Sequence, residues 1–226
     1  LYGLAYSIGM LVQLFISGMN SALTPWMYSK IKKGDIRSMR KVLQLLSVVV
    51  VGIAVALMLI SPELVLIFGS PKYREAVYVI PPVAASVFFI FIYNILSMPQ
   101  FYYEKTQFLM AASMAAAGAN VVLNFIFIRL FGYIAAGYTT LACYMLYSVG
   151  HYIVSKRILV NEGIQENLMN PGFLLACSVF LIGASIICNL IFPYRILRYA
   201  ILLASAGLVF WKKELLLKTM ADIRKK

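Results

Sequence analysis

Charged side chains are scarce in this chain of 226 residues. Only 12% of the residues are Asp, Glu, Lys or Arg, whereas 62% are hydrophobic. A soluble domain has roughly 25% charged and 45–50% apolar residues. No segment of the chain therefore has the polar surface that a water-soluble domain needs, and the composition excludes soluble enzymes and secreted modules.

Residues that build chemical sites are also few. The chain has eight acidic residues, one histidine and three cysteines. Cys143, Cys177 and Cys188 lie inside apolar runs, where a cysteine behaves as a small hydrophobic residue. Cys177 and Cys188 are three helical turns apart, too far to form a disulfide. With no metal-ligand cluster, phosphate-binding loop or nucleophile–base pair in view, we expect a protein that is not an enzyme and has no metal or cofactor.

Long apolar runs are what the chain has in abundance. A bilayer core about 30 Å thick requires about 20 apolar residues per helix. The runs predict an all-α integral membrane protein, because uninterrupted runs without alternating polarity are typical of spanning helices and not of barrel strands. Seven transmembrane helices are expected, at about residues 1–28, 42–60, 76–98, 107–128, 134–154, 172–192 and 196–212.

Local features refine two of these helices. Pro81 and Pro82 are expected to kink the third helix or to delay its start, since each removes a backbone donor. The last helix has only 13 residues free of charge, from Tyr199 to Trp211. It spans the bilayer only if Arg195 and Arg198 extend toward the headgroups at one end.

The basic residues predict the orientation. Cytoplasmic loops of membrane proteins carry an excess of Lys and Arg. One side of the predicted bundle has 15 of the 20 basic residues, in the 29–41 loop, at Lys105, in the 156–170 connector and in the C-terminal tail; the other side has 5. We therefore expect residue 1 outside and the C-terminus in the cytoplasm. The net charge of +12 is explained by membrane topology and does not indicate nucleic-acid binding.

The connecting segments divide the chain. The apolar stretch L-V-L-I-F within residues 61–75 is expected to form a short helix at the outer interface, and the 156–170 connector is a second candidate for an interfacial helix. The division is a five-helix bundle (1–155), the connector (156–170), two further helices (171–212) and a basic cytoplasmic tail (213–226). Because the chain begins inside an apolar run and without Met, we expect it to be a piece of a longer protein.

Uncharged polar side chains recur at helical spacing inside the apolar runs, whereas no charged residue falls at mid-membrane depth. One face of the first helix carries Tyr6, Gly9, Gln13, Ser17, Asn20 and Thr24. Such a face either lines a solvated cavity or bonds to neighbouring helices. Six positions exceed what one helix contact needs, which favours the cavity.

Three other helices have shorter polar faces. The fourth helix has Ser113, Ala117, Asn120 and Asn124, where a run of small residues favours helix packing. The third helix has Ser86, Tyr93, Asn94 and Ser97, and the fifth has Thr140, Tyr144, Tyr147 and His151, the last expected at the interface and not as a proton carrier. The candidate cavity residues are Tyr6, Gln13, Ser17, Asn20, Asn94, Asn120, Asn124, Thr140 and Tyr144.

Three segments carry a resemblance to a known family. They are Y-G-L-A-Y-S-I-G at 2–9 with A-L-T-P-W-M-Y-S-K-I-K-K-G-D-I-R-S-M-R-K at 22–41, P-E-L-V-L-I-F-G-S-P-K-Y-R-E-A at 62–76, and Y-Y-E-K-T at 102–106 running on to N-V-V-L-N-F-I-F-I-R-L-F-G-Y-I-A-A-G-Y-T-T at 120–140. In that order, residues 2–155 resemble the second half of the polysaccharide-type flippases of the multidrug/oligosaccharidyl-lipid/polysaccharide exporter superfamily.

The resemblance implies a two-bundle transporter with alternating access, of which this chain is the C-terminal bundle. The substrate would be a polyprenyl-diphosphate-linked oligosaccharide for polysaccharide biosynthesis in the cell envelope, flipped across a bacterial plasma membrane. The expected partners are the lipid bilayer, this substrate and an N-terminal helical bundle of the same protein. A lipid diphosphate calls for cationic side chains in the cavity, and this chain has none at depth, so either the other bundle supplies them or the substrate differs.

Three other functions compete with the flippase. A drug/cation antiporter of the same superfamily would need a buried acidic residue for the cation or proton, and none is visible here. A seven-helix receptor would fit the helix count and the orientation. A membrane glycosyltransferase would need a large outer loop with catalytic groups, and residues 61–75 are too few and too apolar for that role.

Overall fold

The computed structural model describes residues 2–69 and 71–211, and within them it confirms an all-α bundle. The elements are α1 (Tyr2–Lys32), α2 (Ile36–Phe68), a 3-10 helix η1 (Pro71–Tyr78), α3 (Ile80–Tyr102), α4 (Gln107–Phe131), α5 (Ala135–Asn161), α6 (Pro171–Ile191) and α7 (Arg195–Trp211). Five of the described helices, α1, α2, α3, α4 and α6, are long and apolar enough to cross a membrane. The other two predicted spans are α5, which is richer in polar side chains, and α7, with 17 residues. The predicted tail at 213–226 lies outside the described residues.

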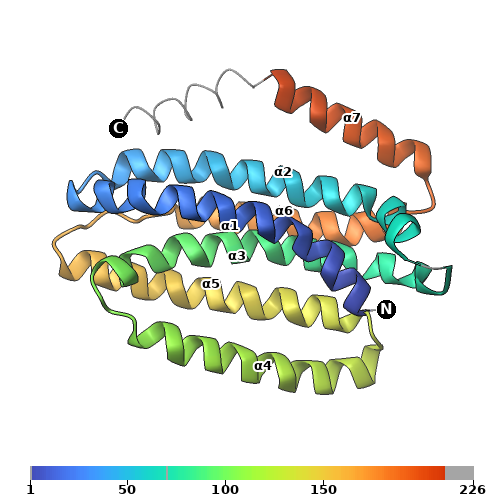
Figure 1. Ribbon diagram of the computed structural model, residues 1–226, viewed down its shortest axis with the longest axis horizontal. Helices are drawn as coiled ribbons and strands as arrows, with labels where there is room; N and C mark the ends of the chain where they lie inside the picture. The colour runs from blue at the N-terminus through green and yellow to red at the C-terminus, as the bar shows by residue number, and fades with distance from the viewer. Residues whose placement is uncertain (1, 70, 212–226) are drawn as a thin grey trace.

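Helix α3 is the centre of the bundle. It packs against α5, α1, α2 and α6, and 89% of its most apolar window is buried inside the protein. Figure 1 shows α4 and α7 at opposite edges, with α3 between α1 and α5. Helix α4 has no fully buried residue and packs on α5, whereas α7 packs on α2 and α6. The lipid-facing edges are thus carried by α4 and α7.

Two prolines set the start of α3. Pro81 and Pro82 occupy its first turn, where backbone N–H groups have no partner within the helix, and α3 therefore begins at Ile80. Of the two predicted outcomes, a kink or a delayed start, the delayed start is the one found. Helices α3 and α5 come close to each other at this first turn. A Cβ on Gly137 of α5 would lie 2.8 Å from Cγ of Pro82, so only glycine fits there.

The segment after Pro62 does not form a separate interfacial helix. That prediction is wrong, because α2 continues without a break to Phe68. Pro62 removes one backbone donor, but Val65, which is 3% exposed, is packed into the core and keeps the last turns of α2 on the bundle. Gly69 then ends the helix, with its N–H bonded to the carbonyl of Val65.

The 156–170 connector is not an interfacial helix either. Helix α5 runs on to Asn161 and is ended by Gly163, whose φ of +81° is the left-handed conformation that favours glycine. The N–H of Ile164 bonds to the carbonyl of Leu159 at 2.8 Å, which closes the helix end. Leu168 and Met169 are buried, and the side chain of Asn170 caps α6. Buried anchors at both sides hold the connector as an ordered turn.

The loops meet at two ends of the bundle, as the alternation of spans predicts (Figure 1). At one end, Arg37 pairs with Glu166 at 3.0 Å and Lys105 pairs with Glu162 at 2.7 Å, which ties three loops together. At the same end Asp35 caps α2 through the N–H of Ser38, and the hydrogen bond from Lys30 lowers the pKa of its carboxyl to about 2. Which end faces the cytoplasm stays a prediction.

Helix α7 is held by a buried ion pair at the other end. Arg198 is 3% exposed, and its two terminal nitrogens each lie 2.9 Å from a carboxylate oxygen of Glu63 on α2. One of them also donates to the carbonyl of Leu59, and the hydroxyl of Tyr199 donates to Glu63. The expectation that Arg198 extends to the headgroups is therefore wrong, because it has a fully formed partner inside the protein. Arg195, in contrast, is exposed.

Candidate functional site

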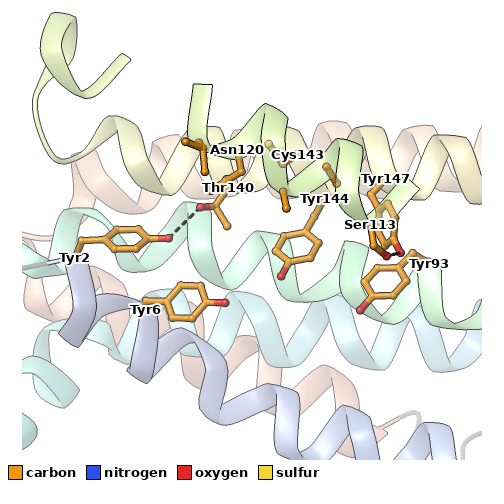
Figure 2. Close-up of a pocket in the computed structure, with 12 residues that line it drawn as sticks. Tyr2, Tyr6, Tyr93, Ser113, Asn120, Thr140, Cys143, Tyr144 and Tyr147 are labelled. Carbon is orange, nitrogen blue, oxygen red and sulfur yellow. Dashed lines mark hydrogen bonds between the residues drawn. The ribbon is translucent and has the colours of Figure 1, made fainter. Parts of the chain in front are cut away.

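A cavity of about 510 Å³ lies between α1, α3, α4 and α5. Figure 2 shows the side chains that line it, with tyrosines from three helices around one hollow. The lining residues are Tyr2 and Tyr6 of α1, Tyr93 of α3, Ser113, Ala116, Ala117, Asn120 and Val121 of α4, and Thr140, Cys143, Tyr144 and Tyr147 of α5. The cavity exists because α4 packs only on α5 and so stands away from α1 and α3.

Hydrogen bonds join the helices across the cavity. The hydroxyl of Tyr2 lies 3.0 Å from Oγ1 of Thr140, which connects the start of α1 to α5 (Figure 2). The hydroxyls of Ser113 and Tyr147 lie 2.7 Å apart and connect α4 to α5. These contacts hold the hydroxyl groups in place at the cavity wall, where each keeps further hydrogen-bonding capacity.

Aromatic faces form the other part of the wall. The rings of Tyr93 and Tyr144 are nearly parallel, with centroids 6.2 Å apart, and Tyr147 meets Tyr93 edge-on at 4.7 Å. Tyr93 is one of only three partly exposed residues between Ile80 and Gln100 of α3. The cavity thus presents rigid ring faces together with hydroxyl and amide groups.

The cavity is neutral. None of its described lining residues is Asp, Glu, Lys, Arg or His. No group of three His, Cys, Asp or Glu residues that could hold a metal ion occurs among the described residues. The wall can therefore donate and accept hydrogen bonds and stack on a ring, but it offers no fixed charge to an ionic ligand.

The structure brings four of the nine candidate residues to the cavity: Tyr6, Asn120, Thr140 and Tyr144. Asn124 lies one turn behind, where its amide donates to Oδ1 of Asn120 and its own oxygen accepts from Thr139 of α5. Asn124 therefore bonds α4 to α5, which is the packing role that the run of small residues favours.

The remaining candidates lie beside the cavity. Gln13, Ser17 and Asn20 continue the face of α1 that begins at Tyr6, and all three are partly or fully exposed. Gly9 belongs to a packed contact instead, since a Cβ there would collide with Cγ1 of Val83.

The few partly exposed residues of α3 lie on the same side of the bundle as this face of α1. Apart from Tyr93, the partly exposed residues within Ile80–Gln100 are Asn94 and Met98. Thr24, which shares the α1 face, donates to Sδ of Met98 at 3.7 Å and so fixes the two strips beside each other. We call the surface of Tyr6, Gln13, Ser17, Asn20, Tyr93, Asn94 and Met98 the open face.

Apart from the apolar Ala116, Ala117 and Val121, two lining residues were missed by the polar spacing, and three were found by it but not chosen as candidates. Tyr93, Ser113 and Tyr147 are in the polar faces of their helices, but the candidate list omits them. Tyr2 is one helical turn before Tyr6, and that spacing could have found it. Cys143 gave no signal, because an apolar cysteine between Thr140 and Tyr144 looks like any packed residue.

His151 lies one helical turn after Tyr147 of the cavity wall and is enclosed by protein. It is fully buried, its Nδ1 lies 2.8 Å from Nε2 of Gln100, and the rings of Tyr147 and Phe108 meet it edge-on. The sequence suggested the interface because His151 comes close to the predicted helix end at residue 154, but α5 continues to Asn161.

Comparison with known proteins identifies the first part of the chain. The family model MatE matches residues 1–126, which include α1 to α3 and most of α4. No curated protein matches the chain. No solved structure matches it either. The α5 wall of the cavity lies beyond the matched residues.

Proposed function

The chain belongs to the MatE family of the multidrug/oligosaccharidyl-lipid/polysaccharide exporter superfamily, and from this premise we propose that it flips a polyprenyl-diphosphate-linked oligosaccharide across a bacterial plasma membrane. The family makes it a multi-pass membrane protein with a transport function of the exporter or flippase kind. The choice of a lipid-linked sugar, for cell-envelope polysaccharide biosynthesis, is our proposal.

The neutral, tyrosine-rich cavity is the observation that supports a sugar. The amide of Asn120 can donate to the hydroxyls of a saccharide, whereas the hydroxyl of Thr140, which donates to the carbonyl of Ala136, can accept from them. The faces of Tyr93 and Tyr144 suit the apolar face of a sugar ring. A volume of about 510 Å³ lies within the range of roughly 300–1,000 Å³ that small-molecule sites occupy.

The open face supports a second helical bundle. A stripe that holds Gln13, Ser17 and Asn20 is unfavourable against lipid, because the bilayer core offers amides and hydroxyls no partner. A second bundle set against the open face would enclose a polar passage that continues from the cavity. Alternating access would then follow from rocking of one bundle against the other, and the cationic side chains for a diphosphate would come from that bundle.

A drug/cation antiporter is the second candidate function, and the tyrosine rings are the observation that favours it. The faces of Tyr93 and Tyr144 can bind an organic cation as well as a sugar. Coupling to a cation or proton would call for a buried carboxylate, and the described cavity lining has none.

The test is a transport assay in liposomes that hold the chain together with the second helical bundle proposed to meet the open face. A fluorescent lipid-linked oligosaccharide should cross the bilayer, and Asn120→Leu, which removes an amide from the cavity, should slow this flipping about tenfold. Val122→Leu is the matched control, because Val122 is 56% exposed on the same helix and does not line the cavity. Uptake of an organic cation under a pH gradient, without flipping of the oligosaccharide, would contradict the flippase proposal and support the antiporter.

A further inference from the structure

A second, apolar groove lies on the opposite side of the α3–α5 pair. Helices α5 and α6 both flank α3, but they scarcely contact each other, and a space of about 280 Å³ is left between them. Its floor is Phe88, Phe89 and Ile92 of α3, and its walls are Met145, Ser148, Val149 and Tyr152 of α5 and Pro171, Leu174, Leu175 and Ser178 of α6. We call this space the α5–α6 groove.

The groove is separate from the cavity. The two sites share no lining residue, and they use alternate faces of α5: Tyr144 and Tyr147 point to the cavity, whereas Met145 and Ser148 line the groove. The groove is therefore outside the path of the headgroup that the cavity would bind.

Hydrocarbon is the occupant that fits the lining. The hydroxyl of Ser148 donates to the carbonyls of Phe89 and Tyr144, and that of Ser178 donates to the carbonyl of Leu174, so neither offers a donor to the groove. Water needs two to four polar partners to fill such a space. An empty space would lose the dispersion contacts of its aromatic and aliphatic walls. Val149 and Leu175 at the rim are 55% and 65% exposed, which leaves the groove open to the bilayer.

Positive charge gathers at one mouth of the groove. The row Ser148 and Tyr152 on α5 continues, after one more turn, to the exposed Lys156. Arg40 donates at 2.7 Å to the carbonyl of Asn167, four residues before Pro171, which lines the groove. In the described part of the chain no acidic side chain pairs with Lys156.

The neighbouring acids do not cancel this charge, and a helix end adds to it. Glu162 and Glu166 of the connector are each paired with another basic residue. The N-terminus of α6, at Pro171, lines the same mouth and carries a partial positive charge.

We propose that the α5–α6 groove binds one acyl chain of an anionic phospholipid, with the phosphate of the headgroup at Lys156 and Arg40. The apolar walls select the chain, the basic mouth selects the negative headgroup, and the ring of Tyr152 lies at the level where the two meet. The lipid would fill the gap between α5 and α6 and would seal them against each other, without entering the cavity.

Retention of lipid by the purified protein tests the proposal. Native mass spectrometry should show one molecule of phosphatidylglycerol retained in preference to phosphatidylcholine with the same chains. Val149→Trp, which fills the groove, should reduce the retained phosphatidylglycerol at least tenfold. Val179→Trp is the matched control, since Val179 is a 63% exposed valine of α6 that does not line the groove. Should Val149→Trp prevent folding, Leu175→Trp fills the groove from the other wall.

The headgroup is tested by a second pair of variants. Lys156→Gln should lower the preference for phosphatidylglycerol about fivefold, whereas Arg157→Gln, an equal loss of charge on the neighbouring face of α5, should not. Equal lipid retention by Val149→Trp and Val179→Trp, or equal binding of the two phospholipids, would overturn the proposal. Binding of a polyprenyl phosphate with no binding of phosphatidylglycerol would overturn it as well, because the groove would then hold the tail of a transported lipid.

Discussion

Gln100 and His151 form a buried polar pair between α3 and α5. Both side chains are fully buried, and a single hydrogen bond of 2.8 Å connects them. Oε1 of Gln100 and Nε2 of His151 have no partner within the described residues. Loss of either member is costly, because His151 would lose its only hydrogen bond within the described residues and Gln100 would keep only its 3.3 Å bond to the carbonyl of Leu96.

We predict that His151→Ala destabilises the protein more than removal of both polar groups does. The alanine leaves Gln100 with only its hydrogen bond to the carbonyl of Leu96 and opens a space, so we expect a loss of about 1–3 kcal/mol in the free energy of unfolding. The double variant Gln100→Leu with His151→Phe replaces the pair by apolar groups of similar shape and should recover most of that loss. Thermal unfolding in detergent measures both. A double variant less stable than His151→Ala would show that the pair contributes net stability.

Most hydroxyls inside the bundle bond to their own helix. Ser47 donates to Leu43, Ser61 to Met58 and Ser86 to Val83, in each case to a backbone carbonyl three or four residues earlier. Such a serine makes its hydrogen bond within its own helix and can therefore lie on any face of that helix. This is why polar spacing alone placed only four of nine candidates at the cavity, and why Asn94, which donates to its own Ile90, gives the same sequence signal as Asn120.

The ion pair of Arg198 and Glu63 is the strongest polar link that α7 makes to the bundle. Both terminal nitrogens of the guanidinium take part, in a forked geometry that a lysine cannot reproduce. Around it α7 has little packing, since Ile196 and Leu203 are 86% and 71% exposed. Among the described side chains of α7, the ion pair is therefore the main attachment to α2.

We predict that Arg198→Ala releases α7 from α2. A fully buried pair that loses one member costs about 3–5 kcal/mol. The loss here is expected to be smaller, because the carboxylate of Glu63 is 25% exposed and keeps the hydroxyl of Tyr199 as a donor. Limited proteolysis of the purified protein should cut near residues 192–195 faster in this variant than in the native chain. Arg198→Lys should restore only part of the protection, and Arg195→Ala, on an exposed neighbour, should have no effect. Unchanged cleavage in Arg198→Ala would mean that α7 is held by packing alone.

Helix positions follow from the sequence better than helix ends do. All seven predicted runs are helices, because an apolar run in a membrane has no other way to bond its backbone. Their ends differ because helices continue past the apolar region for as long as the core or a charged partner holds them. Val65 and Arg198 hold the last turns of α2, up to Phe68, on the bundle, and neither contact can be read from the residues of α2 itself.

For the bundle as a whole, the orientation is the open question that one labelling series answers. In a cysteine-free background, Lys33→Cys and Gln165→Cys should be shielded from an impermeant thiol reagent in intact cells, whereas Tyr194→Cys should react. The expectation rests on the excess of Lys and Arg at the end that carries Lys33 and Gln165. These positions are exposed and free of positive φ, unlike Gly34 and Gly163. Labelling of Lys33→Cys with protection of Tyr194→Cys would invert the assignment.

Only part of the cavity could be predicted from the sequence. The first-helix stripe correctly indicated a polar surface, but most of that surface is the open face and not the cavity. The cavity itself arises because α4 is held away from α1 and α3, and spacing along single helices carries no information about the distance between two of them. The tyrosines of the cavity are hard to recognise as site residues from the sequence, because a half-apolar side chain does not interrupt an apolar run.

The central position of α3 also has a consequence during synthesis of the chain, because its neighbours are made at different times. Its principal neighbour, α5, ends roughly 60 residues after α3 does, and a ribosome adds about 5–20 residues per second. For roughly 3–12 seconds the most enclosed helix of the mature protein has only α1 and α2 beside it, with the sides meant for α5 and α6 still uncovered. During that interval α3 would depend on the insertion machinery or on lipid for shelter, and a delay in translating residues 103–161 would prolong its exposure to degradation.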